Sequence, residues 1–174
     1  MKQIDLSLPK SAIFSEDRRY RYVLWRVWSQ TRRPLLMIGL NPSTANEISD
    51  DPTITRMMVR ANKAGYGSLV MTNLYAFVSS NPDVLLEDGD FIGIETDAYL
   101  IQAIQIADRV ICGWGSFPAA RKRADYVLKM IPQPYCLGVN IDGQPKHPLY
   151  LSYDTPVVKF RRQSSGFHKT LEVS

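Results

Sequence analysis

The stretch LLMIGLNPSTANEISDDPT, from Leu35 to Thr53, decides the fold. It begins as an apolar strand and breaks sharply at Gly39, Asn41 and Pro42. The polar connection that follows is about ten residues long, whereas a purely topological connection in an α/β unit needs roughly two to six. Open α/β sheets bind their ligands just beyond the carboxyl ends of their strands. We therefore interpret this stretch as a sheet strand followed by a binding loop.

Apolar strands and helices alternate over the rest of the chain. Strands are expected near residues 20–28, 68–74, 109–113 and 135–139, and helices near 51–64, 94–107 and 118–130. Asp50 or Asp51 can cap the first helix, with Pro52 in its first turn and Gly65 at its end. A helix remains an alternative for residues 20–28, because residues 15–17 can cap one. Residues 79–89 are expected to form a loop.

This alternation predicts one α/β domain over residues 1–174, with its core at about 12–151 and a frayed tail over 161–174. The expected architecture is a three-layer αβα arrangement. Its central sheet should be mostly parallel, with about four strands plus an N-terminal edge strand or hairpin.

The composition is that of an ordinary globular domain, with 45% hydrophobic and 22% charged residues. A chain of 174 residues buries roughly two thirds of its unfolded surface. Apolar runs stay well short of the ~20 residues that a membrane span needs. The N-terminal residues lack the apolar segment of a signal peptide. Cys112 and Cys136 lie in apolar runs and are expected to be buried thiols, so we expect a cytoplasmic protein without a membrane partner.

The net charge of +4 and the pI near 9.1 are mildly basic. A bias of this size permits binding to DNA or RNA, although a solvated cationic surface is the commoner outcome. The cations gather at Arg18, Arg19, Arg21, Arg26, Arg32, Arg33, Arg121, Lys122, Arg123, Arg161 and Arg162.

The expected strand ends carry polar and aromatic side chains. In a parallel sheet these ends lie along one edge, so residues far apart in sequence should meet there. We expect at least three of five side chains to line a common pocket, with the helix near Pro52 pointing its N-terminus toward it. The alternative is that each residue only satisfies its own turn or cap. The five are Asn41, Asp51, Asn73, Trp114 and His147.

Several motifs along the chain resemble an uncharacterised family, catalogued as domain of unknown function 1643. The resemblance covers residues 12–151 and occurs in the family's order. It rests on YRYxLxRxW, GLNPSTA, DDPTIxR, GYGxLxxxNLYAF, WG and HPLYL.

More remotely, the chain resembles the mismatch-specific branch of the uracil-DNA glycosylase superfamily. The matching pieces are the loop at 39–43, Asn73 and the pair at 147–148. Ser43 stands where that branch has a second glycine, and Leu149-Tyr150 replaces its Ser-Pro wedge. The resemblance implies a uracil-DNA glycosylase-like fold. It also implies a glycosylase-like hydrolase that acts on a nucleobase N-glycosidic bond in DNA or in a nucleoside or nucleotide.

Four residues are candidates for catalysis. The amide of Asn41 can position water, and Asp50 or Asp51 can act as general base and stabilise a cation-like sugar. His147 can donate a hydrogen bond to the oxyanion that develops on the leaving base. The alternatives are an Asx-turn for Asn41, helix capping for one aspartate and an inert loop position for His147.

Eight further residues are candidates for substrate binding. Asn73 would read the base, Trp114 or Tyr75 would stack on it, and Arg56 would bind an anion. Structural amides, core aromatics and surface ion pairs are the respective alternatives. The full set is Gly39, Pro42, Ser43, Thr44, Arg56, Asn73, Tyr75 and Trp114.

No metal or cofactor is expected from the sequence. Two histidines and two strand cysteines do not give metal-ligand spacing, and no phosphate-binding or dinucleotide-binding glycine motif is present. The second hypothesis, beside the enzyme, is a non-catalytic module. Such a module would bind a nucleotide or nucleic acid with the same residues at the edge of the sheet.

Overall fold

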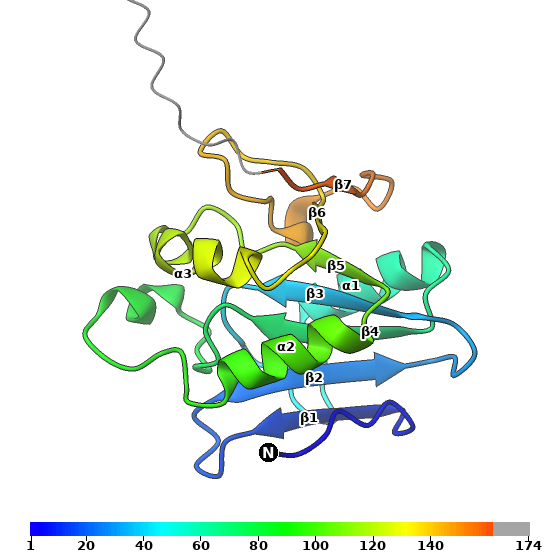
Figure 1. Cartoon of the computed structure of the whole chain (residues 1–174), viewed down its shortest axis with the longest axis horizontal. Helices are drawn as coiled ribbons and strands as arrows, with labels where there is room; N and C mark the ends of the chain where they lie inside the picture. Colours follow the sequence, from blue (N-terminus) through cyan, green and yellow to red (C-terminus); the bar gives the residue numbers. More distant parts are fainter. Residues whose placement is uncertain (162–174) are drawn as a thin grey trace, which may run out of the picture.

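A seven-stranded mixed sheet forms the centre of the molecule, as the computed structural model of residues 1–161 shows (Figure 1). The strand order is β1-β2-β4-β3-β5-β6-β7. The expected frayed tail lies, from residue 162 onward, outside the described residues. The strands are β1 (Lys10–Phe14), β2 (Arg21–Val27), β3 (Pro34–Gly39), β4 (Ser68–Asn73), β5 (Arg109–Cys112), β6 (Pro134–Cys136) and β7 (Val158–Lys159).

The middle of the sheet is parallel and its edges are antiparallel. β4, β3, β5 and β6 run in the same direction, which confirms the expected four-stranded parallel centre. The hairpin β1–β2 extends one side antiparallel to β4, and β7 pairs antiparallel with β6 at the other side. The helical alternative for residues 20–28 is therefore wrong. The short strand β7 was not expected from the sequence, since two paired residues leave no alternation to detect.

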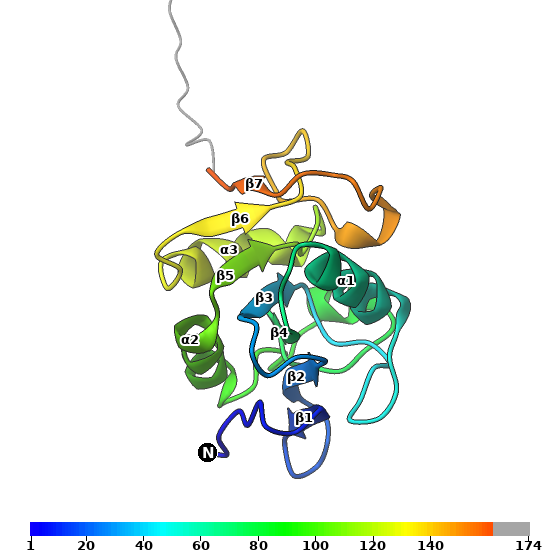
Figure 2. The same cartoon turned by 90° about the vertical axis from the view of Figure 1, so that its right-hand side faces the viewer.

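Helices cover both faces of the sheet, as Figure 2 shows. α1 (Pro52–Lys63) packs on one face through Ile54, Met57 and Ala61. α2 (Thr96–Ile106) and α3 (Pro118–Leu128) pack on the other. Short 3₁₀ turns, η1 (Pro82–Leu86) and η2 (Pro148–Tyr150), interrupt the loops, so the expected loop 79–89 contains one turn of helix. None of the helices in residues 1–161 is both long and apolar enough to cross a membrane.

The two cysteines behave as expected. Cys112 and Cys136 are adjacent across β5 and β6, and both are free and buried. Burial raises the pKa of both thiols. They are structural side chains of the sheet rather than reactive groups.

Two arginines of the basic N-terminal cluster lie inside the fold instead of on its surface. Arg21 and Arg26 are only 2% and 3% exposed, which corrects the expectation of a solvated cationic face for these two positions. Arg26 holds the loop before α1 by donating to Asp50 at 2.8 Å and to the carbonyl of Asn46 at 2.6 Å. The buried guanidinium of Arg26 therefore holds the polar loop that follows β3 in place.

Candidate functional site

A cavity of about 230 Å³ lies at the carboxyl ends of β3 and β4, beside the N-terminus of α1. All five residues expected to meet there do line it, although they span more than a hundred residues of sequence. The gathering at one sheet edge is therefore confirmed, while the chemical roles remain predictions. Its wall consists of Arg21, Gly39, Leu40, Asn41, Ser43, Asp51, Thr53, Ile54, Met71, Asn73, Ser79, Ser80, Pro82, Trp114 and His147.

Gly39 and Asn73 face each other at the ends of the paired strands β3 and β4. A Cβ at residue 39 would lie 2.7 Å from Nδ2 of Asn73 and 2.9 Å from the terminal methyl of Met71. Contacts this short would force the Asn73 amide to move. Glycine at this strand exit therefore makes room for the asparagine side chain, which explains the early break of the apolar run.

The Asn73 amide is oriented by Arg21. Its Oδ1 accepts a long hydrogen bond of 3.5 Å from the guanidinium, while its buried Nδ2 has no partner among the described residues. Arg21 also donates to the carbonyl of Ala45 at 2.7 Å, and its Nε is likewise unpaired. Buried donors without partners are rare because they lose water without compensation. Here they lie in the wall of a cavity, where a ligand or water can accept from them.

Arg21 is the charged site residue that the sequence interpretation missed. The polar lining residues that were missed as well are Thr53, Ser79 and Ser80. Arg21 begins a strand in which every other residue except Arg26 is apolar or aromatic, and this placement was the available signal of burial. Desolvation lowers the pKa of its guanidinium to about 10, and the nearby Asp51 charge opposes the shift. The group therefore remains cationic at neutral pH.

Asn41 braces the loop and leaves one acceptor free. Its Nδ2 donates to the carbonyl of Pro42 at 3.0 Å and to that of Ser79 at 2.9 Å. Both amide hydrogens are thus used by the backbone, and Oδ1 receives no hydrogen bond from the described residues. The nitrogen braces the loop, but not through the expected Asx-turn, in which Oδ1 would accept from the backbone. The oxygen is instead an acceptor in the pocket wall that can hold water.

Asp51 is the N-cap of α1. One carboxylate oxygen accepts from the backbone amide of Ile54 at 2.9 Å, and Pro52 occupies the first helical position. The side chain lines the cavity together with Thr53 and Ile54, so capping and pocket position belong to the same residue. Its second oxygen receives no hydrogen bond within residues 1–161 and remains available to a ligand.

His147 is half-buried and has a defined tautomer. Its Nδ1 accepts from the backbone amide of Leu149 at 3.3 Å, so the neutral ring carries its proton on Nε2. Desolvation lowers the pKa of the imidazole, and the Asp51 charge partly offsets this effect. The ring is therefore neutral at pH 7 and offers an N–H donor.

We expect His147 to titrate below the ordinary histidine pKa of 6.5. As pH falls, the unfolded chain binds this proton first. The contribution of His147 to the free energy of unfolding is therefore fully present above pH 6.5. It is lost as the pH falls from 6.5 through the lower pKa that His147 has in the folded protein. NMR titration of the two histidines measures this, with His168→Gln removing the other signal. His147→Gln should flatten the decline in melting temperature between pH 6.5 and 5. A His147 midpoint at or above 6.5 contradicts the prediction.

Other predicted residues do not contribute side chains to this cavity. Asp50 is paired with Arg26, and Tyr75 is buried and donates to the carbonyl of Ala119 at 2.9 Å. Arg56 lies over the Tyr153 ring at 4.5 Å and donates to the carbonyl of Leu151. Thr44 is exposed and Pro42 is buried, and neither lines the cavity.

Trp114 lines the cavity but offers little surface for stacking. It is 2% exposed, its ring packs edge-on against Phe160, and its indole N–H donates to Gln144 at 2.8 Å. The residue therefore forms part of the pocket floor. Within residues 1–161, no group of three or more His, Cys, Asp or Glu is arranged to hold a metal ion.

The family model described as "Protein of unknown function (DUF1643)" matches residues 21–149 of the chain. Because the match covers most of the chain, the protein belongs to this family. No curated protein and no solved structure matches it.

Proposed function

We propose that this chain, whose family has no established activity, hydrolyses the N-glycosidic bond of a nucleoside or nucleotide. One observation carries the proposal. A single cavity combines a carboxylate and an amide acceptor, Asp51 and Asn41, with donors from Asn73 and His147. The acceptors suit a water nucleophile, and the donors suit the oxygen of a nucleobase.

The proposed reaction assigns each residue one task. Oδ1 of Asn41 and the free oxygen of Asp51 orient a water toward the anomeric carbon, and Asp51 receives the proton. The bond between that carbon and the base nitrogen breaks, and its electron pair moves onto the base. Nε2–H of His147 and Nδ2–H of Asn73 stabilise the resulting oxyanion. The Asp51 charge also stabilises the cation-like sugar of the transition state.

The distribution of charge favours a small substrate over DNA. Arg21 and Arg26 are buried, and other cations of the basic clusters are engaged in ion pairs. Of the clustered arginines within residues 1–161, only Arg19, Arg32 and Arg161 are exposed and outside ion pairs, and none of them lines the cavity to neutralise a phosphate backbone there. The pairs are Arg18–Glu47, Arg33–Asp108, Arg121–Asp142 and Arg123–Asp97.

The glycosylase superfamily resemblance supports the same chemistry, since Asn41, Asn73 and His147 occupy its motif positions. Leu149-Tyr150 follows the His-Pro pair in place of the Ser-Pro wedge of that branch, and Tyr150 is exposed on the 3₁₀ turn η2. This departure from the DNA-acting motif favours a free nucleoside or nucleotide.

Release of free base tests the proposal. Purified protein is incubated with a panel of nucleosides, nucleotides and modified-base oligonucleotides, and base and sugar are quantified by chromatography. We expect free base and sugar in equal amounts from at least one nucleoside or nucleotide. Turnover of oligonucleotides alone would move the substrate to DNA. If no substrate is cleaved at high enzyme concentration, the hydrolase proposal is wrong, and saturable binding without cleavage would favour the binding-module hypothesis.

A further inference from the structure

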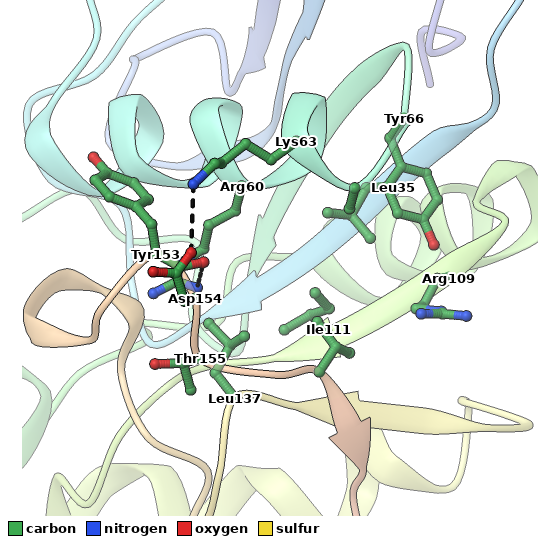
Figure 3. Close-up of a pocket in the computed structure, with 12 residues that line it drawn as sticks. Leu35, Arg60, Lys63, Tyr66, Arg109, Ile111, Leu137, Tyr153, Asp154 and Thr155 are labelled. Carbon is green, nitrogen blue, oxygen red and sulfur yellow. Dashed lines mark hydrogen bonds and ion pairs between the residues drawn. The ribbon is translucent and has the colours of Figure 1, made fainter.

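A second cavity, of about 280 Å³, lies at the opposite end of α1 (Figure 3). Its lining comes from the beginning of β3, from β5 and from the last turn of α1. The lining of the candidate site comes from the opposite ends of β3 and α1. The 12-residue helix α1 is roughly 18 Å long, and the two cavities lie at its opposite ends. The lining residues of the second cavity are Leu35, Arg60, Lys63, Ala64, Tyr66, Arg109, Ile111, Leu137, Tyr153, Asp154, Thr155 and Val157.

Cationic groups lie at two sides of this cavity. Figure 3 shows Arg60 and Lys63 of α1 on one side and Arg109 of β5 on the other. Lys63 is paired with Asp154 at 3.5 Å, and both side chains are largely exposed. Within residues 1–161, neither Arg60 nor Arg109 forms an ion pair. The lining thus carries three cations and one carboxylate, a net positive charge.

Arg60 is buried without a carboxylate partner. It is 7% exposed, and its guanidinium donates only to backbone carbonyls, those of Leu151, Ser152 and Tyr153. Its Nε has no hydrogen-bond partner among the described residues. Buried charges are normally paired because desolvation is costly. The wall of the cavity therefore has a positive charge that forms no ion pair within residues 1–161, although the Tyr153 ring lies 5.6 Å from the Arg60 guanidinium.

An apolar floor separates the cationic sides. Leu35, Ile111 and Leu137 line this cavity, but each is only 2% exposed, so the floor adds a small apolar surface to the larger one of the Tyr153 side chain, which is 36% exposed. Figure 3 shows Leu35 and Ile111 between the α1 cations and Arg109. Tyr66 adds an aromatic wall. A fully solvated ion gains nothing from such a floor, whereas an apolar or aromatic group does.

We propose that this cavity is a second binding site, specific for a small organic anion that joins an acidic group to an apolar or aromatic body. The acidic group, a carboxylate or a phosphate, pairs with Arg109 or with the Arg60–Lys63 side. The body lies on the floor formed by Leu35, Ile111 and Leu137. The cavity is close in size to the smaller ligand pockets of proteins, about 300 Å³. The inference does not depend on the proposed hydrolysis, because it shares no lining residue with the candidate site.

NMR titration with benzoate, phenyl phosphate and neutral benzamide tests the site and its ligand chemistry. We expect saturable shifts of the methyl signals of Leu35, Ile111 and Leu137 with at least one of the two anions. Benzamide has a similar body without the charge, so its Kd should be at least about tenfold higher, as loss of one charge-assisted hydrogen bond predicts. The stronger of benzoate and phenyl phosphate identifies the preferred acidic group. Equal binding of benzamide, or shifts confined to the cavity around His147, would overturn the proposal.

Two variants act on the site from different sides. Arg109→Gln removes one cation, and Ala64→Trp blocks the cavity from the exposed end of α1 without changing a core residue. Ala64→Trp should raise the Kd of the bound anion about tenfold or more, and Arg109→Gln should do the same if the acidic group pairs with Arg109 rather than with the Arg60–Lys63 side. The matched control is Lys122→Gln, which removes an exposed cation on α3 and should leave the Kd unchanged. If both cavity variants bind as tightly as the wild type while remaining folded by circular dichroism, the proposed site does not exist.

Discussion

Replacing Asp51 by asparagine is expected to lower the rate of base release by about 10²- to 10⁴-fold, the usual contribution of a positioned general base. Asparagine is as good an N-cap as aspartate, so α1 should keep its first turn. What the substitution removes is the carboxylate that receives the proton from water and stabilises the sugar cation. Initial rates of base release and the melting temperature, measured on the same preparation, separate the chemical effect from a structural one.

Asp50→Asn is the matched control for this experiment. The neighbouring carboxylate has the same chemistry, but it pairs with Arg26 and does not line the cavity. We expect its rate to stay within about threefold of the wild-type rate, a change worth less than ~1 kcal/mol. Equal losses of activity in the two variants would show that loop structure, and not the Asp51 carboxylate, supports turnover.

Replacing Arg26 by methionine is expected to lower the free energy of unfolding by about 3–5 kcal/mol, the usual cost of removing one partner of a buried charge pair. The loss should be closer to about 3 kcal/mol than to about 5 kcal/mol, because the Asp50 side chain is 34% exposed and its charge is only partly desolvated. Methionine retains much of the aliphatic volume but removes the donor to the Asn46 carbonyl and one of the two donors to the Ser49 carbonyl. Urea denaturation measures the loss.

Arg18→Met provides the comparison, because it removes a surface cation that contacts the same loop from the β1–β2 connection. Arg18 pairs with Glu47 at 2.8 Å, but the two side chains are 56% and 36% exposed. An ion pair in water contributes about 0.2–1 kcal/mol, so this variant should be nearly as stable as the wild type. Similar losses in both variants would contradict the view that burial makes Arg26 the anchor of the loop.

Local patterns were enough to predict the parallel centre of the fold. The apolar run before Gly39 and the Asp-Pro-Thr signal of α1 specify a strand, a break and a helix start within one short stretch. Each depends on backbone preferences that act between near neighbours. The edge strands β1 and β7 are short, and β7 consists of two residues, so their pairing depends on partners distant in sequence.

The site was predicted in location but not in composition. Strand exits in a parallel sheet must share an edge, so the meeting of Asn41, Asn73 and His147 follows from topology. Arg21 was missed because an arginine in a basic segment is usually solvated. Tyr75 was expected to stack on a ligand, but it points into the core and bonds to α3.

The sequence by itself determined the strand–loop–helix unit, the direction of the central strands and the edge at which polar residues collect, because these depend on local backbone chemistry and on the handedness of parallel connections. Only the tertiary structure decided which polar atoms remain unpaired. Asp51 keeps one oxygen free beyond its helix cap, and the Asn73 amide keeps its Nδ2 unpaired while Arg21 holds its oxygen. Such differences depend on which distant groups pack against each side chain, and no local pattern encodes that packing.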